Sequence, residues 1–274
     1  MTVQTGSFRV LPPAGLPRLL GTGRATAVIE RNVRVYQHGW IVLISGLFEP
    51  LFYLFSVGVG VAQLVGTVTL ESGQVVSYTE FVAPAMLAAS AMNGAVVDST
   101  FNVFFKLKYA KLYDAVLATP VTPADIAAGE IAWALIRGSF YSAAFLLVMA
   151  AMGLVTSWWV LLVLPAALLI GFAFAAVGLA ATTYMRTWQD FEYIMLATLP
   201  MFLFSATFFP LATYPAALQG VVQVSPLYHA AALIRELTTG SVSMQSVVHA
   251  LVLLALGLVG LVLAGRRLEK LLLR

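Results

Sequence analysis

The sequence KLKYAKLYDAVLATPVTPADIAAGE, residues 106–130, is the one long polar interruption in an otherwise apolar chain. Three lysines fall within its first six residues, and such clusters mark the cytoplasmic flank of a membrane span. Apolar and aromatic residues at helical spacing follow and predict a short amphipathic helix. The Thr-Pro-Val-Thr-Pro corner at residues 119–123 should end it, because a residue before proline is disfavoured in the α conformation. A second helix should then begin with Thr122 as N-cap, Pro123 at the first helical position and Asp125 three residues after the cap.

The composition places the chain among integral membrane proteins. Of its 274 residues, 61% are hydrophobic and only 10% are charged, and the mean hydropathy is +0.93. Soluble domains carry about 25% charged residues. The net charge is +3, but nucleic-acid binding needs a basic face, and the sequence predicts no soluble domain that could carry one. We therefore expect no nucleic-acid partner. Because the chain has no cysteine, a disulfide framework and a cysteine-based metal or redox site are excluded.

Long charge-poor stretches predict an all-α membrane protein with six transmembrane helices, since a span needs about 20 apolar residues. The predicted spans are residues 40–62, 78–105, 122–152, 158–186, 190–209 and 247–264. Residues 211–240, before the last span, are interrupted by prolines and polar groups, so an extracellular re-entrant helical segment is predicted there. Small residues in the fourth span should allow neighbouring helices to approach closely. These residues are Ala167, Gly171, Ala175 and Gly178.

The first 38 residues are predicted to lie on the cytoplasmic side of the membrane. Residues 1–21 are expected to form a disordered tail and not a cleaved signal, because no apolar signal core follows the first basic residue. Residues 22–38 carry apolar side chains at helical spacing and arginines elsewhere on the wheel, which predicts an amphipathic helix in the membrane interface. A plain basic juxtamembrane segment is the alternative. Residues 22–274 as a whole should form a single transmembrane domain.

The distribution of cations orients the predicted spans. All but two of the 15 lysines and arginines lie in the N-terminal segment, the loop at residues 106–125, the turn after the fourth span or the C-terminal end. The exceptions are Arg137, inside the third span, and Arg235, on the opposite side. The positive-inside rule therefore places both termini and the polar loop in the cytoplasm.

Three ionisable residues in the predicted membrane region are candidates for a functional role. Glu49, beside Pro50 in the first span, must face protein or water and is the candidate for a proton-carrying group. Arg137 should lie within the inner leaflet, and one interpretation is a snorkelling arginine with Trp133 at the membrane interface. The other interpretation pairs Arg137 with Glu130, seven residues earlier on the same helix face, as a polar strut.

The sequence contains no common catalytic motif. We find no HExxH, no GxSxG, no aspartate-rich metal cluster and no GxxxxGK[ST] nucleotide loop. The three histidines, His38, His229 and His249, fall in separate regions with no shared ligand set, and His229 is expected to be a packed or interfacial imidazole. We therefore expect no enzyme active site, and neither a metal nor a cofactor bound by this chain.

Several short segments carry a resemblance to a known family. They are YTEFVAP at residues 78–84, LKY at 107–109 through ATP at 118–120, GEIAW at 129–133 with Arg137, SPLYH at 225–229, and IREL at 234–237 with Gly240. In this order and spacing they resemble the permease subunit of type-2 ABC exporters, most nearly its nodulation (NodJ-like) and daunorubicin-resistance branches. The resemblance covers nearly the whole chain from about residue 24.

The resemblance implies that this chain transports without hydrolysing ATP itself. In such exporters two permeases, identical or homologous, pair within the membrane. Two separate cytoplasmic ATPase subunits dock beneath them and bind ATP and Mg²⁺, which agrees with the missing nucleotide loop. Residues 106–125 would then form the coupling loop, although a loop that merely caps two spans is the alternative. The residues expected to contact the ATPase are Tyr109, Lys111, Leu112, Tyr113, Leu117 and Pro120.

The spans are poor in charge and rich in aromatic and small residues, which favours a hydrophobic or amphipathic substrate. A drug, a glycolipid or a lipid-linked saccharide would fit, and Phe202, Phe204 and Phe208 are candidates for its path. The expected function is export across the bacterial plasma membrane, with membrane lipid around the multi-pass chain. The alternatives are a proton-coupled secondary transporter that uses Glu49 and a membrane scaffold without transport of its own.

Overall fold

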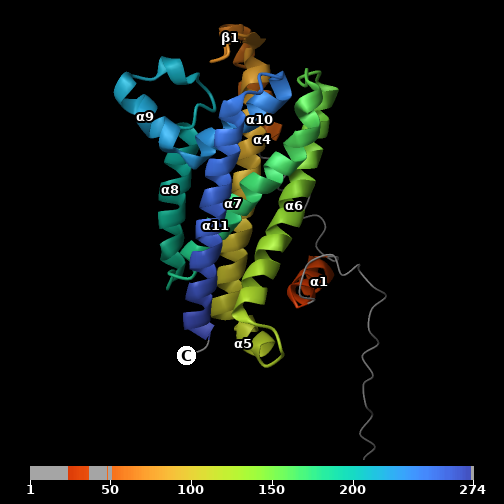
Figure 1. Cartoon of the computed structure of the whole chain (residues 1–274), viewed down its shortest axis with the longest axis vertical. Coiled ribbons are helices and arrows are strands. Elements are labelled where there is room, and N and C mark those ends of the chain that lie inside the picture. Colours follow the sequence, from red (N-terminus) through yellow and green to blue (C-terminus); the bar gives the residue numbers. More distant parts are fainter. Residues whose placement is uncertain (1–23, 37–47, 49–50, 273–274) are drawn as a thin grey trace, which may run out of the picture.

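The structure is a computed structural model that describes residues 24–36, 48 and 51–272. It is nearly all helical, and its long helices run side by side along one axis (Figure 1). Four helices are long and apolar enough to cross a membrane. They are Tyr78–Tyr109, Pro123–Ala151, Trp158–Thr182 and Met244–Leu272. These four correspond to the second, third, fourth and sixth spans that the sequence predicts.

The helix Tyr78–Tyr109 contains two π-helical stretches toward its end. The remaining elements are shorter and connect or flank the long helices. The bounds are α1 (Ala25–Tyr36), η1 (Leu54–Val59), α3 (Ala62–Val65), β1 (Thr67–Thr69), β2 (Val75–Ser77), α4 (Tyr78–Val97), η2 (Asp98–Asn102), η3 (Phe105–Tyr109), α5 (Leu112–Leu117), α6 (Pro123–Ala151), η4 (Trp158–Leu162), α7 (Val163–Thr182), η5 (Trp188–Asp190), α8 (Phe191–Leu203), η6 (Leu211–Thr213), α9 (Ala216–Val224), α10 (Pro226–Thr239) and α11 (Met244–Leu272).

The first and fifth predicted spans are shorter in the structure than the sequence suggests. The described part of the first belongs to an apolar helical stretch, Leu51–Val65, which is too short to cross a bilayer alone. α8 has 13 residues, or about 20 Å of helix. Glu49 and Pro50 lie outside the described residues. Length and composition therefore identify four spans among the described residues, and the first and fifth predicted spans are not among these four.

The loop between α4 and α6 has the helix–turn–helix form that the sequence predicts. The side chain of Thr122 accepts a hydrogen bond from the backbone N–H of Asp125 at 3.2 Å, and the Asp125 carboxylate accepts one from the backbone N–H of Thr122 at 3.0 Å. This capping box fixes the start of α6 at Pro123. One feature differs: Lys111 adopts a left-handed conformation, with φ of 44°, and so separates α5 from the preceding helix.

α7 contacts α4, α6 and α11, and small residues make these contacts close. A Cβ atom added to Gly178 would lie 2.1 Å from Ser99 Oγ, and one added to Gly171 would lie 3.1 Å from a Leu135 methyl group. The predicted small-residue stripe is confirmed as a packing surface. A second pair of glycines was not anticipated: Gly257 and Gly260 of α11 lie directly against α7.

Gly260 provides a test of this packing. A Cβ atom there would lie 2.7 Å from the backbone nitrogen of Val177, which cannot rotate away. We expect Gly260→Ala to lower the stability by about 1–3 kcal/mol through overpacking. Gly265→Ala in the same helix meets no atom within 4 Å and should leave stability unchanged or raise it by less than about 1 kcal/mol. Thermal unfolding in detergent measures both, and equal stabilities would refute the close α7–α11 contact.

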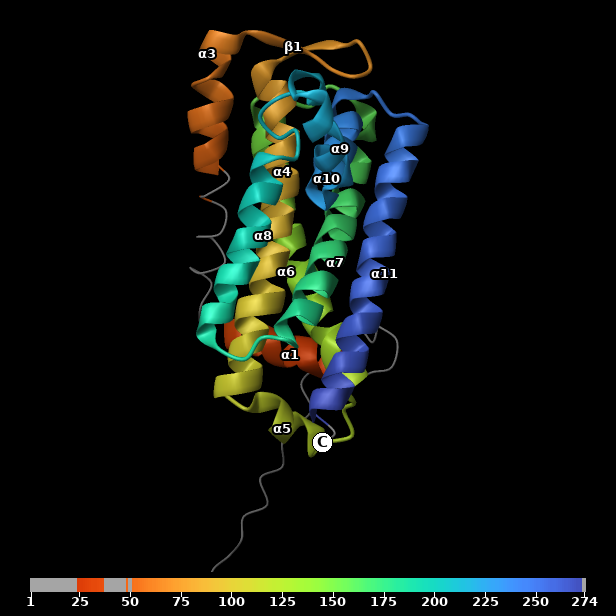
Figure 2. The same ribbon diagram turned by 90° about the vertical axis from the view of Figure 1, so that its left-hand side faces the viewer.

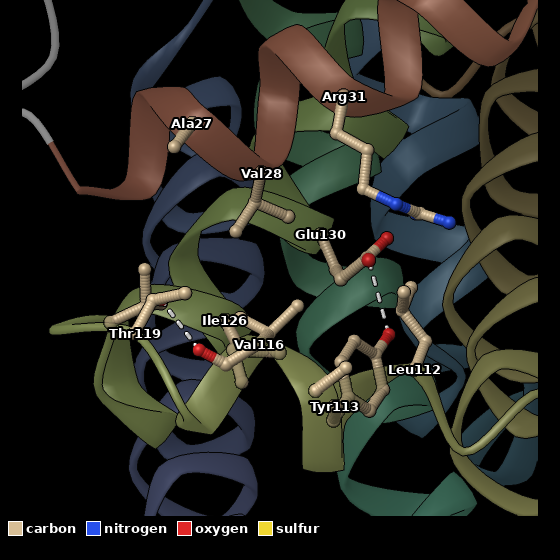
Figure 3. A pocket seen from close by; sticks show the side chains of 11 residues that line it. Ala27, Val28, Arg31, Leu112, Tyr113, Val116, Thr119, Ile126 and Glu130 are labelled. Carbon is tan, nitrogen blue, oxygen red and sulfur yellow. Dashed lines mark hydrogen bonds between the residues drawn. The ribbon is translucent and has the colours of Figure 1, made fainter. Parts of the chain in front are cut away.

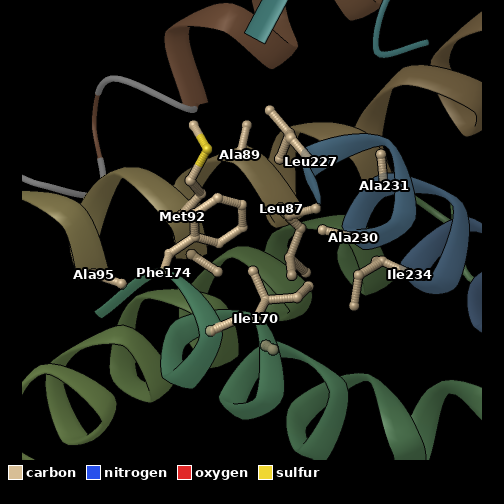
Figure 4. Close-up of a cluster of buried hydrophobic side chains, with 14 of the residues drawn as sticks. Leu87, Ala89, Met92, Ala95, Ile170, Phe174, Leu227, Ala230, Ala231 and Ile234 are labelled. Carbon is tan, nitrogen blue, oxygen red and sulfur yellow. The ribbon is translucent and has the colours of Figure 1, made fainter. Parts of the chain in front are cut away.

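The region predicted as a re-entrant segment contains two helices, α9 and α10. α10 is largely buried and packs against α4, α7 and α11. Figure 4 shows Leu227 and Ile234 of α10 beside Met92 of α4 and Ile170 of α7 in the hydrophobic core. The sequence analysis predicted a re-entrant helical segment here. The second helix, α10, forms part of the core, because its apolar side chains are turned toward three other helices.

Polar groups of this region make contacts that the sequence analysis did not predict. Arg235, predicted to lie on the side opposite the other cations, is only 8% exposed and donates hydrogen bonds to the carbonyls of Phe81 at 3.0 Å and Ala206 at 2.9 Å. The prediction that the histidines lie in separate regions is wrong for two of them. Nδ1 of His229 lies 2.7 Å from Nδ1 of His249, which is consistent with the packed imidazole expected for His229, while His38 lies outside the described residues.

A small hairpin lies between the first and second predicted spans. β1 and β2 are antiparallel, with Thr67 opposite Ser77 and Thr69 opposite Val75. Figure 1 places the hairpin at one end of the bundle and α5 at the other. The two ends therefore differ in structure: a hairpin at one, and the α5 loop with α1 at the other.

Candidate functional site

Buried polar side chains gather at the end of the bundle that carries α5. Here α1 lies across the bundle, roughly perpendicular to the long helices (Figure 2). Gly129 of α6 makes this crossing close, because an added Cβ atom would lie 2.6 Å from Val28 Cβ of α1. Two groups of ionisable and hydrogen-bonding residues connect α1 and α6 to the helix that begins as α4. We call them the Glu130 cluster and the Arg137 cluster.

The Glu130 cluster joins four separate elements through one carboxylate. Glu130 of α6 is only 4% exposed. One of its oxygens, Oε2, accepts from Lys106 Nζ of η3 at 2.6 Å and from Asn32 Nδ2 of α1 at 3.2 Å. The other, Oε1, accepts from the Tyr113 hydroxyl of α5 at 3.0 Å. Lys106 also donates to Asn32 Oδ1 at 3.0 Å, so the ammonium has two partners.

The Arg137 cluster lies farther along the same helices. Nη1 of Arg137 donates to Asp98 Oδ1 at 2.5 Å and to the Tyr36 hydroxyl at 3.2 Å, and Nη2 donates to the Tyr141 hydroxyl at 3.0 Å. Asn102 Nδ2 donates to the same Asp98 oxygen at 2.6 Å. Asp98 is 4% exposed, and a charge buried so deeply is tolerated only when it is paired and hydrogen-bonded.

These contacts correct both sequence-based interpretations of Arg137. Its guanidinium pairs with Asp98 and not with Glu130, whose ion-pair partner is Lys106. The snorkelling interpretation is also wrong, because the side chain is only 11% exposed and is enclosed by protein groups. Trp133 is buried, with its ring 5.2 Å from that of Tyr36, so it is a packing residue between α6 and α1.

The two clusters are connected by the helices that carry them. Glu130 and Arg137 are two turns apart on α6, and Asn32 and Tyr36 are one turn apart on α1, so each pair lies on one helix face. Their partners Asp98 and Lys106 lie in the two π-helical stretches η2 and η3. Such wider turns are uncommon and occur frequently at functional sites. Hydrogen bonds therefore connect α5 to α6, and they connect α1 both to α6 and to the end of the α4 helix.

A cavity of about 240 Å³ lies between α1, the α5 loop and the start of α6. Figure 3 shows Glu130 between Arg31 of α1 and Tyr113 of α5. The lining is mostly apolar. It consists of Ala27, Val28, Arg31, Leu112, Tyr113, Ala115, Val116, Thr119, Val121, Ile126 and Glu130. Arg31 forms no ion pair among the described residues and donates only to Asn32 Oδ1, at 3.3 Å.

The residues predicted to contact an ATPase divide into exposed and buried ones. Tyr109 is 61% exposed, and Lys111 and Pro120 are also exposed. Leu112 and Leu117 are half-buried, and Leu112 lines the cavity. Tyr113, which was also predicted to contact an ATPase, is only 2% exposed, and its hydroxyl donates to Glu130, so it is not part of the exposed surface of the loop.

Tyr113 instead fastens α5 to the bundle. Burial, and next the negative charge of Glu130, raise the pKa of Tyr113 well above its usual value of about 10. Its hydroxyl therefore stays protonated and continues to donate to the carboxylate. Burial also raises the pKa of Tyr36, whose hydroxyl accepts from Arg137.

The exposed part of the loop forms a continuous stretch at the end of the molecule. We call it the docking face. It comprises Tyr109, Lys111, Asp114, Ala115, Ala118, Thr119 and Pro120. It contains no group of three or more histidine or acidic residues that could hold a metal ion, nor does any other part of the described chain. The arrangement is that of an exposed surface connected to the bundle through Tyr113.

The other candidate residues lie away from this end or outside the described residues. The ring centroids of Phe202 and Phe208 lie 5.4 Å apart. The ring centroid of Tyr53 lies 5.8 Å from that of Phe202. Phe204 is 44% exposed. Glu49 lies outside the described residues, so its role as a proton carrier stays a prediction.

Six participants in the two clusters escaped the sequence analysis. It gave no pairing role to Asn32, Tyr36, Asp98, Asn102 and Tyr141, and it used Lys106 only as one of the lysines at the cytoplasmic flank. One signal was available: Asp98 and Arg137 are opposite charges in two predicted spans, and charges within a membrane usually pair with one another. The amide and hydroxyl partners carry no comparable signal, because such residues are common at helix surfaces.

Comparison with known proteins identifies the family of this chain. The profile of the family called ABC-2 type transporter matches residues 24–238. Nodulation protein J of Rhizobium leguminosarum bv. viciae is 34% identical over 233 residues, which cover 84% of this chain and 85% of that protein. Nodulation protein J of Rhizobium meliloti (strain 1021) is 34% identical over 218 residues, or 78% of this chain and 81% of that protein. The chain therefore belongs to the ABC-2 type transporter family of membrane-spanning transport subunits and is a NodJ-like permease.

Proposed function

We propose that this chain is the permease subunit of an ATP-driven exporter and that separate ATPase subunits drive it from the cytoplasm. Two ATPase subunits would dock beneath a pair of permeases, which are two copies of this chain or this chain and a homologue. ATP and Mg²⁺ would bind to the ATPases alone. The observation that carries the proposal is the Glu130 cluster, because one buried carboxylate joins the α5 loop to α1, α6 and the end of the α4 helix.

The proposed topology has six spans in the bacterial plasma membrane, with both termini in the cytoplasm. The four long helices would be joined by a first span that includes Leu51–Val65 and by a fifth built on α8. α1 would lie in the cytoplasmic interface, and the β1–β2 hairpin would lie outside. α9 and α10 would form the re-entrant segment. The crosswise orientation of α1 supports this placement, because an interfacial helix lies in the plane of the membrane (Figure 2).

Docking would use the docking face together with the cavity beside it. The cavity has a mostly apolar lining and includes the guanidinium of Arg31, which forms no ion pair within the described part of the chain, so it suits an apolar side chain that has a carboxylate nearby. Movement of α5 would then act on Tyr113 and Glu130, and through Lys106 on the π-helical end of the second span. Buried hydrogen-bonded ion pairs resist such displacement, so the long helices should move with the loop.

The proposed substrate is hydrophobic or amphipathic, such as a drug, a glycolipid or a lipid-linked saccharide. The exposed aromatic and aliphatic side chains of the outer half support this class, including Phe204 at 44% and Phe209 at 58% exposure. The similarity to nodulation protein J favours a glycolipid among these. The paired rings of Phe202 and Phe208 would form part of the path.

Changes on the docking face should separate ATPase binding from folding. We expect Tyr109→Ala with Lys111→Glu to reduce the amount of co-purified ATPase about ten-fold or more, because exposed tyrosines and matched charges dominate such interfaces. Membrane insertion should not change, and thermal stability should fall only slightly, because both residues are exposed and the Tyr109 ring packs against those of Phe104 and Phe105. Lys270→Glu, which changes an exposed cation of α11, is the charge-matched control. Wild-type ATPase recovery with the double variant would contradict the proposed docking face.

Transport in membrane vesicles distinguishes the exporter from the other two classes. The proposal predicts vanadate-sensitive transport that requires ATP and the separate ATPase. Transport driven by a pH gradient and abolished by Glu49→Gln would instead establish a proton-coupled carrier. A complex that binds the ATPase but never moves substrate would be a scaffold.

A further inference from the structure

A second groove lies on the other side of the same end of the bundle, where α7 ends and α8 begins. Its volume is about 400 Å³, and it shares no residue with the cavity beside α1. Figure 2 shows the α7–α8 turn at the same end as α5 and the last turns of α11. The lining consists of Ala181, Tyr184, Met185, Arg186, Asp190, Tyr193 and Ile194.

Two arginines lie at the groove, one in its lining and one beside it. Arg186 is exposed, and a second guanidinium, that of Arg267 in α11, stacks on the Tyr184 ring at 4.1 Å from its centroid. Neither arginine forms an ion pair among the described residues. Asp190 is the one acidic residue of the lining. Its carboxylate already accepts from the backbone N–H groups of Arg186 at 2.6 Å and Thr187 at 3.1 Å, and from the Thr187 hydroxyl at 3.3 Å.

The groove continues into an apolar face that faces away from the bundle. Tyr193 is 70% exposed at the rim, and α8 then exposes Met195 at 69%, Leu196 at 70% and Leu199 at 60%. Tyrosines in this position are typical of a membrane–water interface. The surface therefore carries arginine side chains at one end and apolar side chains along α8, in that order.

We propose that this groove binds the phosphate group of an anionic membrane lipid, with the acyl chains along α8. Guanidinium groups bind phosphate oxygens through paired charge-assisted hydrogen bonds. Basic pockets between helices on the cytoplasmic side recruit such headgroups from the anionic inner leaflet. A soluble phosphate ester offers the same head chemistry, but it would leave the apolar face of α8 without a role. The choice of leaflet rests on the proposed function, which puts this end in the cytoplasm.

The test measures lipid bound to the purified permease by native mass spectrometry, with phosphatidylglycerol and phosphatidylcholine as probes. We expect phosphatidylglycerol to bind more than phosphatidylcholine, and Arg186→Gln to reduce the phosphatidylglycerol signal about five-fold. Arg186→Lys, which keeps the positive charge, should retain most of the signal. Lys108→Gln removes an exposed cation at the same end, away from the groove, and should retain all of it.

Three outcomes would overturn the inference. They are equal binding of the two lipids, equal phosphatidylglycerol binding by Arg186→Gln and the unmodified protein, and displacement of the lipid by an equal concentration of soluble glycerol phosphate. The last would assign the groove to a soluble phosphate ester. The assay uses the permease without an ATPase, so its failure leaves the docking proposal intact. Loss of ATPase co-purification, conversely, leaves the lipid result unaffected.

Discussion

Glu130→Gln should lower the free energy of unfolding by about 3 kcal/mol or more, because it leaves the Lys106 ammonium without its charge partner in a buried site. The carboxylate accepts from three donors, whereas glutamine has one acceptor oxygen and presents an NH₂ group to the remaining donors. The NH₂ group would face Lys106 and Asn32, or the Tyr113 hydroxyl. Thermal or denaturant unfolding of the purified protein measures the loss.

The matched control makes the same chemical change at an exposed acid. Glu30 pairs with Arg34 one turn later in α1, where the two side chains are 34% and 57% exposed. Glu30→Gln should cost less than about 1 kcal/mol. Lys106→Met combined with Glu130→Gln should be less damaging than the sum of the single changes, because the double variant buries no unpaired charge. Strict additivity would show that the two groups do not interact.

Arg137→Met should be at least as damaging, with a loss of about 3–5 kcal/mol. The change leaves Asp98, which is 4% exposed, without its ion-pair partner. It also removes the guanidinium that donates hydrogen bonds to the hydroxyls of Tyr36 and Tyr141. An unpaired carboxylate within a span is costly because no water compensates it. Asp98→Asn should restore part of the stability of Arg137→Met.

Arg34→Met in α1 is the control for this second change. It removes an arginine whose side chain is 57% exposed, so stability should change by less than about 1 kcal/mol. Equal effects of Arg34→Met and Arg137→Met would contradict the buried pair. In the assembled transporter, Arg137→Met should also lower substrate-stimulated ATPase activity in the fraction that remains folded.

Local features of the fold were predictable from the sequence because their causes are local. Thr122, Pro123 and Asp125 specify the start of α6 within three positions, and the structure contains the full capping box. The prolines at 120 and 123 separate α5 from α6. Long apolar runs gave the approximate bounds of four spans. The small residues of α7 likewise report close packing, since only a missing or small side chain allows it.

The contacts between helices were not predictable, because they depend on how each helix is rotated about its axis. Arg137 and Glu130 share a helix face, so their spacing alone suggested that they pair with each other. The π-helical stretches η2 and η3 change the register of the second span and turn Asp98 and Lys106 toward α6. No local signal in the sequence marked these wider turns.

Tyr113 illustrates the same limit at the docking face. Helical spacing placed it with Leu112 and Leu117 on one apolar surface, and the sequence could not decide which side of that surface faces a partner. The left-handed turn at Lys111 rotates α5 so that Tyr113 points inward and Tyr109 stays exposed. The loop at residues 106–125 thus lies between α4 and α6 as predicted, and Tyr113 lies on its buried side.

The most direct test of the account is the position of the α5 loop. The chain has no cysteine, so Lys111→Cys introduces its one thiol, on an exposed residue of the docking face. A membrane-impermeant thiol reagent should label it in inside-out vesicles and not in intact cells, and co-expressed ATPase should protect it. Labelling from outside the cell, or no protection by the ATPase, would contradict a permease driven through this loop.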